Sequence, residues 1–166
     1  MAERILYLVC DVSGSMSEGG KRMLMRGLVR TIEQYIRFRY GAAILKLVIW
    51  RDVATLVEWG FDDEVPDEFL NCHGSANVVS LRNLIESQPK GQVLLLTDGA
   101  LSVEESRNLC RWNRALPTNA LRLIRIGCEE NLLLRGVTVF ESEQVFEALD
   151  DWMPRAQNGN KEEDEW

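Results

Sequence analysis

One apolar run, residues 4–11 ("RILYLVCD"), constrains the fold of this 166-residue chain more than any other feature. It is continuously hydrophobic rather than alternating, which is typical of a strand buried on both faces of a parallel sheet. The run ends at Asp11, and Ser13 and Ser15 follow at alternate positions beside glycines. A second run, residues 92–99 ("QVLLLTDG"), also reaches an aspartate. Two buried strands that end in oxygen-bearing side chains predict a polar site at one edge of a sheet.

The rest of the chain alternates between strand-like and helix-like segments. Residues 60–74 lack a clear period and predict a loop with a short helix. The alternation predicts an α/β fold: a three-layer, doubly wound (Rossmann-like), mostly parallel sheet with helices on both faces and one antiparallel strand at its edge. We expect strands at 4–11, 43–50, 53–59, 92–99, 120–128 and 137–141, and helices at 21–41, 78–87, 103–116 and 143–153.

Composition and charge restrict the class of protein. The chain is 46% hydrophobic and 27% charged, as in an ordinary soluble globule, and its formal net charge of -7 argues against binding nucleic acid or anionic lipid. No run is long enough to span a membrane, and no signal peptide is evident, so we expect a cytoplasmic protein. The four cysteines lack CxxC spacing, which favours reduced thiols over a disulfide or zinc framework. They are Cys10, Cys72, Cys110 and Cys128.

The length allows one domain, which we place at residues 1–154. The last residues, 155–166 ("RAQNGNKEEDEW"), are polar and acidic and predict a disordered tail. A solubilising role is the simpler interpretation of this tail, with occupation of the polar site by its carboxylates as the alternative.

The oxygen-bearing side chains suggest a metal site. Asp11, Ser13 and Ser15 leave one strand on the same side, Asp98 follows a later strand, and Ser75 precedes a helix. Turn and cap preferences explain one such loop but not matching ligands on three loops. Oxygen-only ligands that include two carboxylates suit Mg²⁺, with Mn²⁺ or Ca²⁺ as alternatives. Zinc would favour cysteine or histidine, and the sole histidine is isolated in sequence.

These motifs resemble the von Willebrand factor A (vWA) domain family. "DVSGSM" is similar to its DxSxS signature, "TDG" to its second aspartate motif, and "HGSANV" stands where the family has a glycine-threonine loop. The resemblance extends to about Met153 and implies a metal-ion-dependent adhesion site. It implies that Ser13 and Ser15 bind the cation directly and that Asp11 and Asp98 act largely through waters. Ser75 departs from the family threonine, keeping the hydroxyl and losing the methyl group.

The resemblance also implies a function. It suggests a Mg²⁺-dependent protein-interaction module that binds an aspartate or glutamate side chain of a partner protein. The chain looks like the intracellular, single-domain vWA proteins of microbes, which act in multi-protein systems beside AAA+ ATPases, kinases or phosphatases. We expect neither nucleic acid nor membrane as a direct partner.

Two further interpretations stay open. Ser13, His73 and Asp98 are candidates for a hydrolase triad, and phosphoryl transfer on Mg²⁺ is conceivable, but no GxSxG elbow, P-loop or GxGxxG is present. We therefore expect a docking module rather than an enzyme. Four arginines of the first helix share one side, and a solvated face is the simpler interpretation, with a dock for an acidic partner as the alternative. They are Arg22, Arg26, Arg30 and Arg37.

Overall fold

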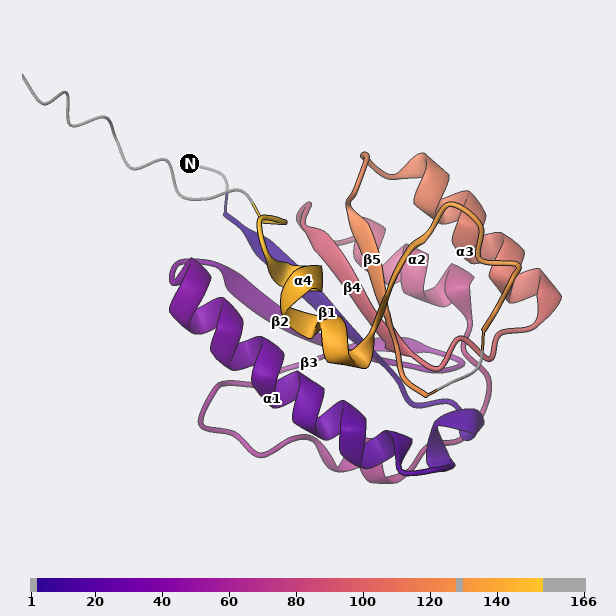
Figure 1. Ribbon diagram of the computed structural model, residues 1–166, viewed down its shortest axis with the longest axis horizontal. Coiled ribbons are helices and arrows are strands. Elements are labelled where there is room, and N and C mark those ends of the chain that lie inside the picture. Colours follow the sequence, from indigo (N-terminus) through magenta and orange to yellow (C-terminus); the bar gives the residue numbers. More distant parts are fainter. Residues whose placement is uncertain (1–2, 128–129, 154–166) are drawn as a thin grey trace, which may run out of the picture.

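The predicted α/β architecture is present in the structure, a computed structural model in which residues 3–127 and 130–153 are described (Figure 1). Its centre is a six-stranded sheet with the strand order β3-β2-β1-β4-β5-β6. All neighbouring strands pair in parallel except β2 and β3, which form the antiparallel edge. The strands are β1 (Ile5–Asp11), β2 (Ile44–Trp50), β3 (Ala54–Val57), β4 (Gln92–Thr97), β5 (Leu121–Arg125) and β6 (Thr138–Glu141).

The strand order reverses between β1 and β4. From β1 the chain moves outward through β2 to β3, and it then returns to the other side of β1 to form β4. Cys10 of β1 pairs with Leu96 of β4, so the residues that follow both strands emerge at the same edge of the sheet. Ligands of open α/β sheets bind at such a reversal point. The fold therefore brings the loops after β1 and β4 together.

Helices cover both faces of the sheet. In Figure 1, α1 and α4 lie on one face, while α2 and α3 lie on the other. Alternate residues of β1 supply the two hydrophobic cores: Leu6 and Leu8 pack in the cluster that contains α1 and α4, and Tyr7 and Val9 pack in the cluster that contains α2 and α3. The helices are α1 (Lys21–Tyr40), α2 (Val78–Glu86), α3 (Val103–Ala115) and α4 (Val145–Leu149).

Side-chain caps start two of these helices. The Asn77 side chain accepts a hydrogen bond from the backbone N–H of Ser80 at the start of α2. The Ser102 hydroxyl accepts one from the backbone N–H of Glu105 at the start of α3. Each cap satisfies a backbone donor that the helix itself leaves unpaired.

The last helix is shorter than the sequence pattern predicts. Instead of a helix over 143–153, the chain forms a 3-10 helix, η3 (Ser142–Gln144), and then α4, which ends at Leu149. Asp151 has a φ of 53°, and the Trp152 indole N–H donates to the Asn119 carbonyl over 2.6 Å. The helix stops because the chain turns inward to bury Trp152 and give its N–H a partner. Residues 60–74 contain the expected short helix, the 3-10 helix η2 (Asp67–Leu70).

Three cysteines lie in the described residues, and all three are free thiols. Burial raises the pKa of Cys10 well above its ordinary value, so this thiol stays protonated. Within residues 3–127 and 130–153, none of the helices is long and apolar enough to cross a membrane. Cys128, the domain boundary at residue 154 and the predicted tail, residues 155–166, lie outside the described residues.

Arg30 and Arg37 of α1 make contacts within the chain. Arg30 donates to the Phe61 carbonyl over 3.1 Å, and its guanidinium lies 5.2 Å from the centre of the Trp59 ring. Arg37 forms an ion pair with Glu33 over 2.8 Å. Arg30 thus attaches the loop after β3 to α1, and Arg37 pairs with a residue one turn earlier in the same helix. At these two positions the arginines are more than a solvated face.

Candidate metal centre

Asp11, the last residue of β1, is buried and accepts two hydrogen bonds. One carboxylate oxygen accepts from the backbone N–H of Ser13 over 2.8 Å, and the other accepts from the Thr97 hydroxyl over 2.6 Å. Burial raises the pKa of the Asp11 carboxyl, although these two hydrogen bonds act to lower it. The bond to Thr97 joins the end of β1 to the end of β4.

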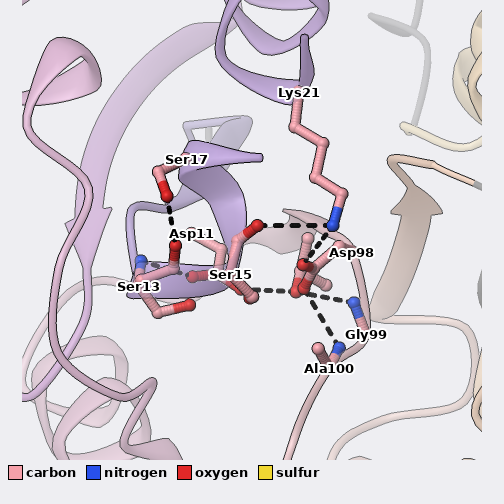
Figure 2. Close-up of polar contacts among 10 residues, drawn as sticks. Asp11, Ser13, Ser15, Ser17, Lys21, Asp98, Gly99 and Ala100 are labelled. Atoms are coloured by element: carbon pink, nitrogen blue, oxygen red, sulfur yellow. Dashed lines mark hydrogen bonds and ion pairs between the residues drawn. The ribbon is translucent and has the colours of Figure 1, made fainter. Parts of the chain in front are cut away.

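Asp98 lies one residue beyond β4 and is also 1% exposed. One of its oxygens accepts from the backbone N–H of Ala100 over 3.0 Å. The other forms an ion pair with Lys21 over 3.0 Å. Figure 2 shows the Lys21 side chain descending from α1 so that its ammonium lies between the Ser15 carbonyl and Asp98.

The loop before α2 is attached to the loop after β1 by two backbone hydrogen bonds. Gly14 donates to the Gly74 carbonyl and His73 donates to the Val12 carbonyl, each over 2.9 Å. Gly74 has a φ of 74°, and a Cβ there would lie only 2.8 Å from a carboxylate oxygen of Asp52. Glycine is therefore required at this position, both for the left-handed backbone and for the close approach of Asp52.

The three serines of the predicted site line one cavity. Ser13, Ser15 and Ser75 lie in the wall of a cavity of about 410 Å³, which the first turn of α3 and the residues before it also line. Asp11 and Asp98 lie directly behind this wall, because they accept from the backbone N–H groups of Ser13 and Ala100, which line it. The cavity wall thus contains the three serines, and the predicted carboxylates bind backbone N–H groups of that wall.

The Ser15 hydroxyl oxygen is buried and has no hydrogen-bond partner. Among the described residues, the Trp112 indole N–H is also buried without a hydrogen-bond partner, but Trp112 of α3 packs in the apolar core. A buried hydroxyl without a partner costs free energy, so an unpartnered one at a cavity wall indicates a missing ligand. A divalent cation fits this donor set, because hydroxyl and carboxylate oxygens are hard ligands. Within the described residues no cluster of three or more His, Cys, Asp or Glu side chains could hold a metal, so a cation here would depend on the serines.

Two residues of the site were not found from the sequence. Lys21 carries its signal at the first position of α1, where the helix dipole disfavours a positive charge. Asp52 lies in the hairpin turn between β2 and β3, and no local pattern links it to Ser75. Its carboxylate accepts a hydrogen bond from the Ser75 backbone N–H over 3.0 Å. This contact spans 23 residues of sequence, so only the folded chain reveals it.

The three residues of the alternative hydrolase interpretation, Ser13, His73 and Asp98, are not joined by hydrogen bonds in the described part of the chain. The ring nitrogen Nδ1 of His73 lies 3.1 Å from the Arg51 guanidinium and 3.1 Å from the Asn71 carbonyl oxygen. Ser13 and Asp98 have other neighbours, as described above, and among the described residues neither makes a hydrogen bond with the ring. The hydrogen-bonded arrangement in which a histidine activates a serine is therefore not formed by these three residues here.

Comparison with known proteins gives structural matches only. No protein-family model matches the sequence, and no curated protein matches it. The manganese-loaded TRAP protein of Plasmodium vivax is similar with a TM-score of 0.65 and 13% identity, over 90% of this chain and 73% of that one. The SpRpn10 VWA domain has a TM-score of 0.61 and 13% identity, over 85% and 89% of the two chains.

A third similar structure is proximal thread matrix protein 1 from the mussel byssus, with a zinc-occupied MIDAS motif. Its TM-score is 0.54 at 17% identity, and the match covers 89% of this chain and 45% of that one. Together with the strand order and the antiparallel edge, these similarities show that the chain has the vWA fold.

Proposed function

We propose that this vWA-fold chain is a protein-interaction module whose docking depends on a divalent cation. Ser13, Ser15 and Ser75 would hold the cation, with Asp11 and Asp98 behind them. The observation that carries the proposal is the buried, unpartnered hydroxyl of Ser15 at the wall of the cavity. The metals named for two similar structures, manganese and zinc, support a divalent cation, and the oxygen ligands favour Mg²⁺.

The chemistry of the proposed ligand follows from the charges around the cavity. Asp52 and Glu105 line the cavity, and Asp11 and Asp98 lie behind its wall. Among these described residues, the negative charges of four carboxylates outnumber the positive charge of Lys21. An acidic partner is repelled from such a cavity unless a cation is present. A bound cation supplies an electrophilic position for an incoming carboxylate. The proposed partner is therefore a protein that presents an aspartate or glutamate side chain.

The first experiment measures metal binding itself. Mg²⁺ and Mn²⁺ are titrated by calorimetry into the full chain after treatment with EDTA. Ser15→Ala is expected to weaken binding by at least about tenfold. Ser17→Ala is the matched control, because Ser17 lies in the same turn but donates its hydroxyl to the Gly14 carbonyl. Equal affinities in the wild type and Ser15→Ala would remove Ser15 from the site.

The second experiment measures carboxylate binding. The probe of a partner side chain is the N-acetyl α-amide of aspartic acid, called N-acetyl-aspartamide below, whose side-chain carboxylate is free. Water proton relaxation by bound Mn²⁺ reports whether the probe displaces metal-bound water. We expect displacement in the wild type and in Ser17→Ala, and no probe binding without metal. Binding of the probe that EDTA leaves unchanged would contradict the proposal.

A further inference from the structure

Lys21 places a positive charge inside the candidate metal centre. Its ammonium lies 3.0 Å from a carboxylate oxygen of Asp98 and 3.3 Å from the Ser15 carbonyl oxygen. The side chains of Lys21 and Asp98 are only 14% and 1% exposed, so water screens this charge weakly. The ammonium thus contacts two of the three loops that carry the proposed ligands, the loop after β1 and the loop after β4, as Figure 2 shows.

The position of Lys21 is fixed by its surroundings. It is the first residue of α1, and the two glycines before it, Gly19 and Gly20, have φ values of 59° and 75° and turn the chain into the helix. The lysine stem passes Gly127, where a Cβ would lie 3.3 Å from its Cε. A cation at a helix N-terminus interacts unfavourably with the helix dipole, and the ion pair with Asp98 offsets this cost.

The ammonium changes the charge of the site. Asp11 and Asp98 carry two negative charges, which a divalent cation would neutralise completely. Counted over these two carboxylates alone, Lys21 reduces the charge to one negative before the cation binds and one positive afterwards, and Asp52 and Glu105 at the cavity wall add further negative charge in both states. The first effect weakens attraction for the cation, and the second strengthens attraction for a carboxylate.

We propose that Lys21 is a specificity-determining residue that shifts the site from holding the cation to holding the partner. It lowers the affinity of the free protein for divalent cations and raises the affinity of the loaded protein for a carboxylate. The cation and the carboxylate bind cooperatively because their own charges attract each other, and Lys21 shifts the two affinities in opposite directions. This inference rests on the proposed function and adds to it the residue that sets the balance between the two affinities.

A purely structural role for Lys21 makes different predictions. If the ammonium only supports Asp98, its removal leaves a buried carboxylate without its partner and lowers the stability of the metal-free protein. Metal affinity would then stay the same or fall, because Asp98 would lose its position. The direction of the change in metal affinity therefore separates the two roles.

The test compares Lys21→Met and Lys21→Gln with the wild type, in the full chain, with Mg²⁺ or Mn²⁺ alone as the first ligand. Lys21→Gln is the second neutral variant in case methionine prevents folding. Lys90→Met is the matched control, because Lys90 is exposed and precedes β4 at the opposite edge of the sheet. Calorimetry gives the metal affinity, and Mn²⁺ relaxation gives the affinity of the loaded protein for N-acetyl-aspartamide.

We expect the neutral variants at Lys21 to bind the metal at least about tenfold more tightly and the probe at least about tenfold more weakly, with Lys90→Met within about twofold of wild type. Unchanged or weaker metal binding in the neutral variants would overturn the inference and leave the proposed function intact. Absence of metal binding in the wild type and every variant would overturn both. Metal binding by the neutral variants alone would overturn the proposed function, because the native chain would then hold no cation for a partner to bind.

Discussion

The two ends of helix α1 treat their buried polar groups differently. At the far end, the buried Tyr40 hydroxyl donates to the Leu149 carbonyl over 2.9 Å, and the Tyr35 hydroxyl contacts the Asp150 carboxylate. At the near end, Lys21 reaches buried Asp98, and the Ser15 hydroxyl has no partner. Both ends pack against the same sheet, so the difference does not come from burial alone.

This difference separates structure from ligand binding. Polar groups at the far end are matched by other groups of the chain, which attaches α1 to the residues around α4. At the near end, the Ser15 hydroxyl oxygen is buried without a hydrogen-bond partner among the described residues, which is where we propose that a cation binds. Substitutions at the far end should therefore affect stability alone, whereas those at the near end should affect metal binding, stability or both according to what each side chain contacts.

The largest expected change in stability comes from Asp11→Ala. Its removal leaves the Ser13 N–H and the Thr97 hydroxyl without their buried acceptor, so the metal-free protein should lose about 2–4 kcal/mol of unfolding free energy. Urea denaturation in EDTA measures this loss. Such a result would show that Asp11, at the near end, also stabilises the fold without metal.

Asp11→Asn is the control for this substitution. Asparagine keeps an acceptor for the Ser13 N–H, and the Thr97 hydroxyl can accept from its amide, so most of the stability should return. Metal affinity should still fall by about 10- to 100-fold, because the charge is lost. Full recovery of metal binding in Asp11→Asn would show that the charge of Asp11 has no role in the site.

A smaller loss of stability is expected from Tyr40→Phe at the far end. The substitution leaves the Leu149 carbonyl without its hydroxyl donor in a buried position, which costs about 1 kcal/mol. Metal affinity should stay within about twofold of the wild type, since Tyr40 is the last residue of α1 and Lys21 the first. A tenfold change in metal affinity would break the comparison between the two ends.

Ser15→Ala should raise the stability of the metal-free protein by about 1 kcal/mol, because it removes a buried hydroxyl that makes no hydrogen bond among the described residues. The wild type should nevertheless gain thermal stability on addition of Mg²⁺, and the variant should gain less. Thermal unfolding with and without Mg²⁺ measures both effects. A large loss of metal-free stability would mean that the hydroxyl is matched within the chain.

The smallest expected effect on stability comes from Tyr35, whose ionisation changes stability only above neutral pH. Burial and the contact with Asp150 raise its pKa from 10.0 to about 12. Between these values the folded state binds more protons than the unfolded chain, so the stabilising contribution is complete below pH 10.0 and is lost as the pH rises towards about 12. Ultraviolet absorbance of tyrosinate should show late titration to which Tyr7 and Tyr35 both contribute, because burial raises the pKa of each. Tyr35→Phe should remove the part near pH 12, and Asp150→Asn should shift that part to lower pH.

Much of the fold was predictable because its signals are local. Continuous apolar runs predict β1 and β4, and the predicted helices at 21–41, 78–87 and 103–116 correspond to α1, α2 and α3. The last helix was predicted too long, because its end depends on where Trp152 finds a core and an acceptor on Asn119. A helix that ends through long-range packing leaves no clear stop signal in its own residues.

The sequence alone determined which residues stand at the ends of β1 and β4, because apolar runs end where polar residues begin. It therefore placed Asp11, Ser13, Ser15 and Asp98 at one edge of a parallel sheet, and the structure has them there. Their part in binding a metal stays a prediction that the titrations above will test.

Only the tertiary structure decided which groups share the site with them. Lys21 meets Asp98 across 77 residues of sequence, and Asp52 meets Ser75 across 23. Neither contact has a local pattern, because the distance between two charges depends on how strands and helices pack and not on their own periodicity. The charge of the site, and with it the balance between cation and partner, is therefore a property of the folded chain.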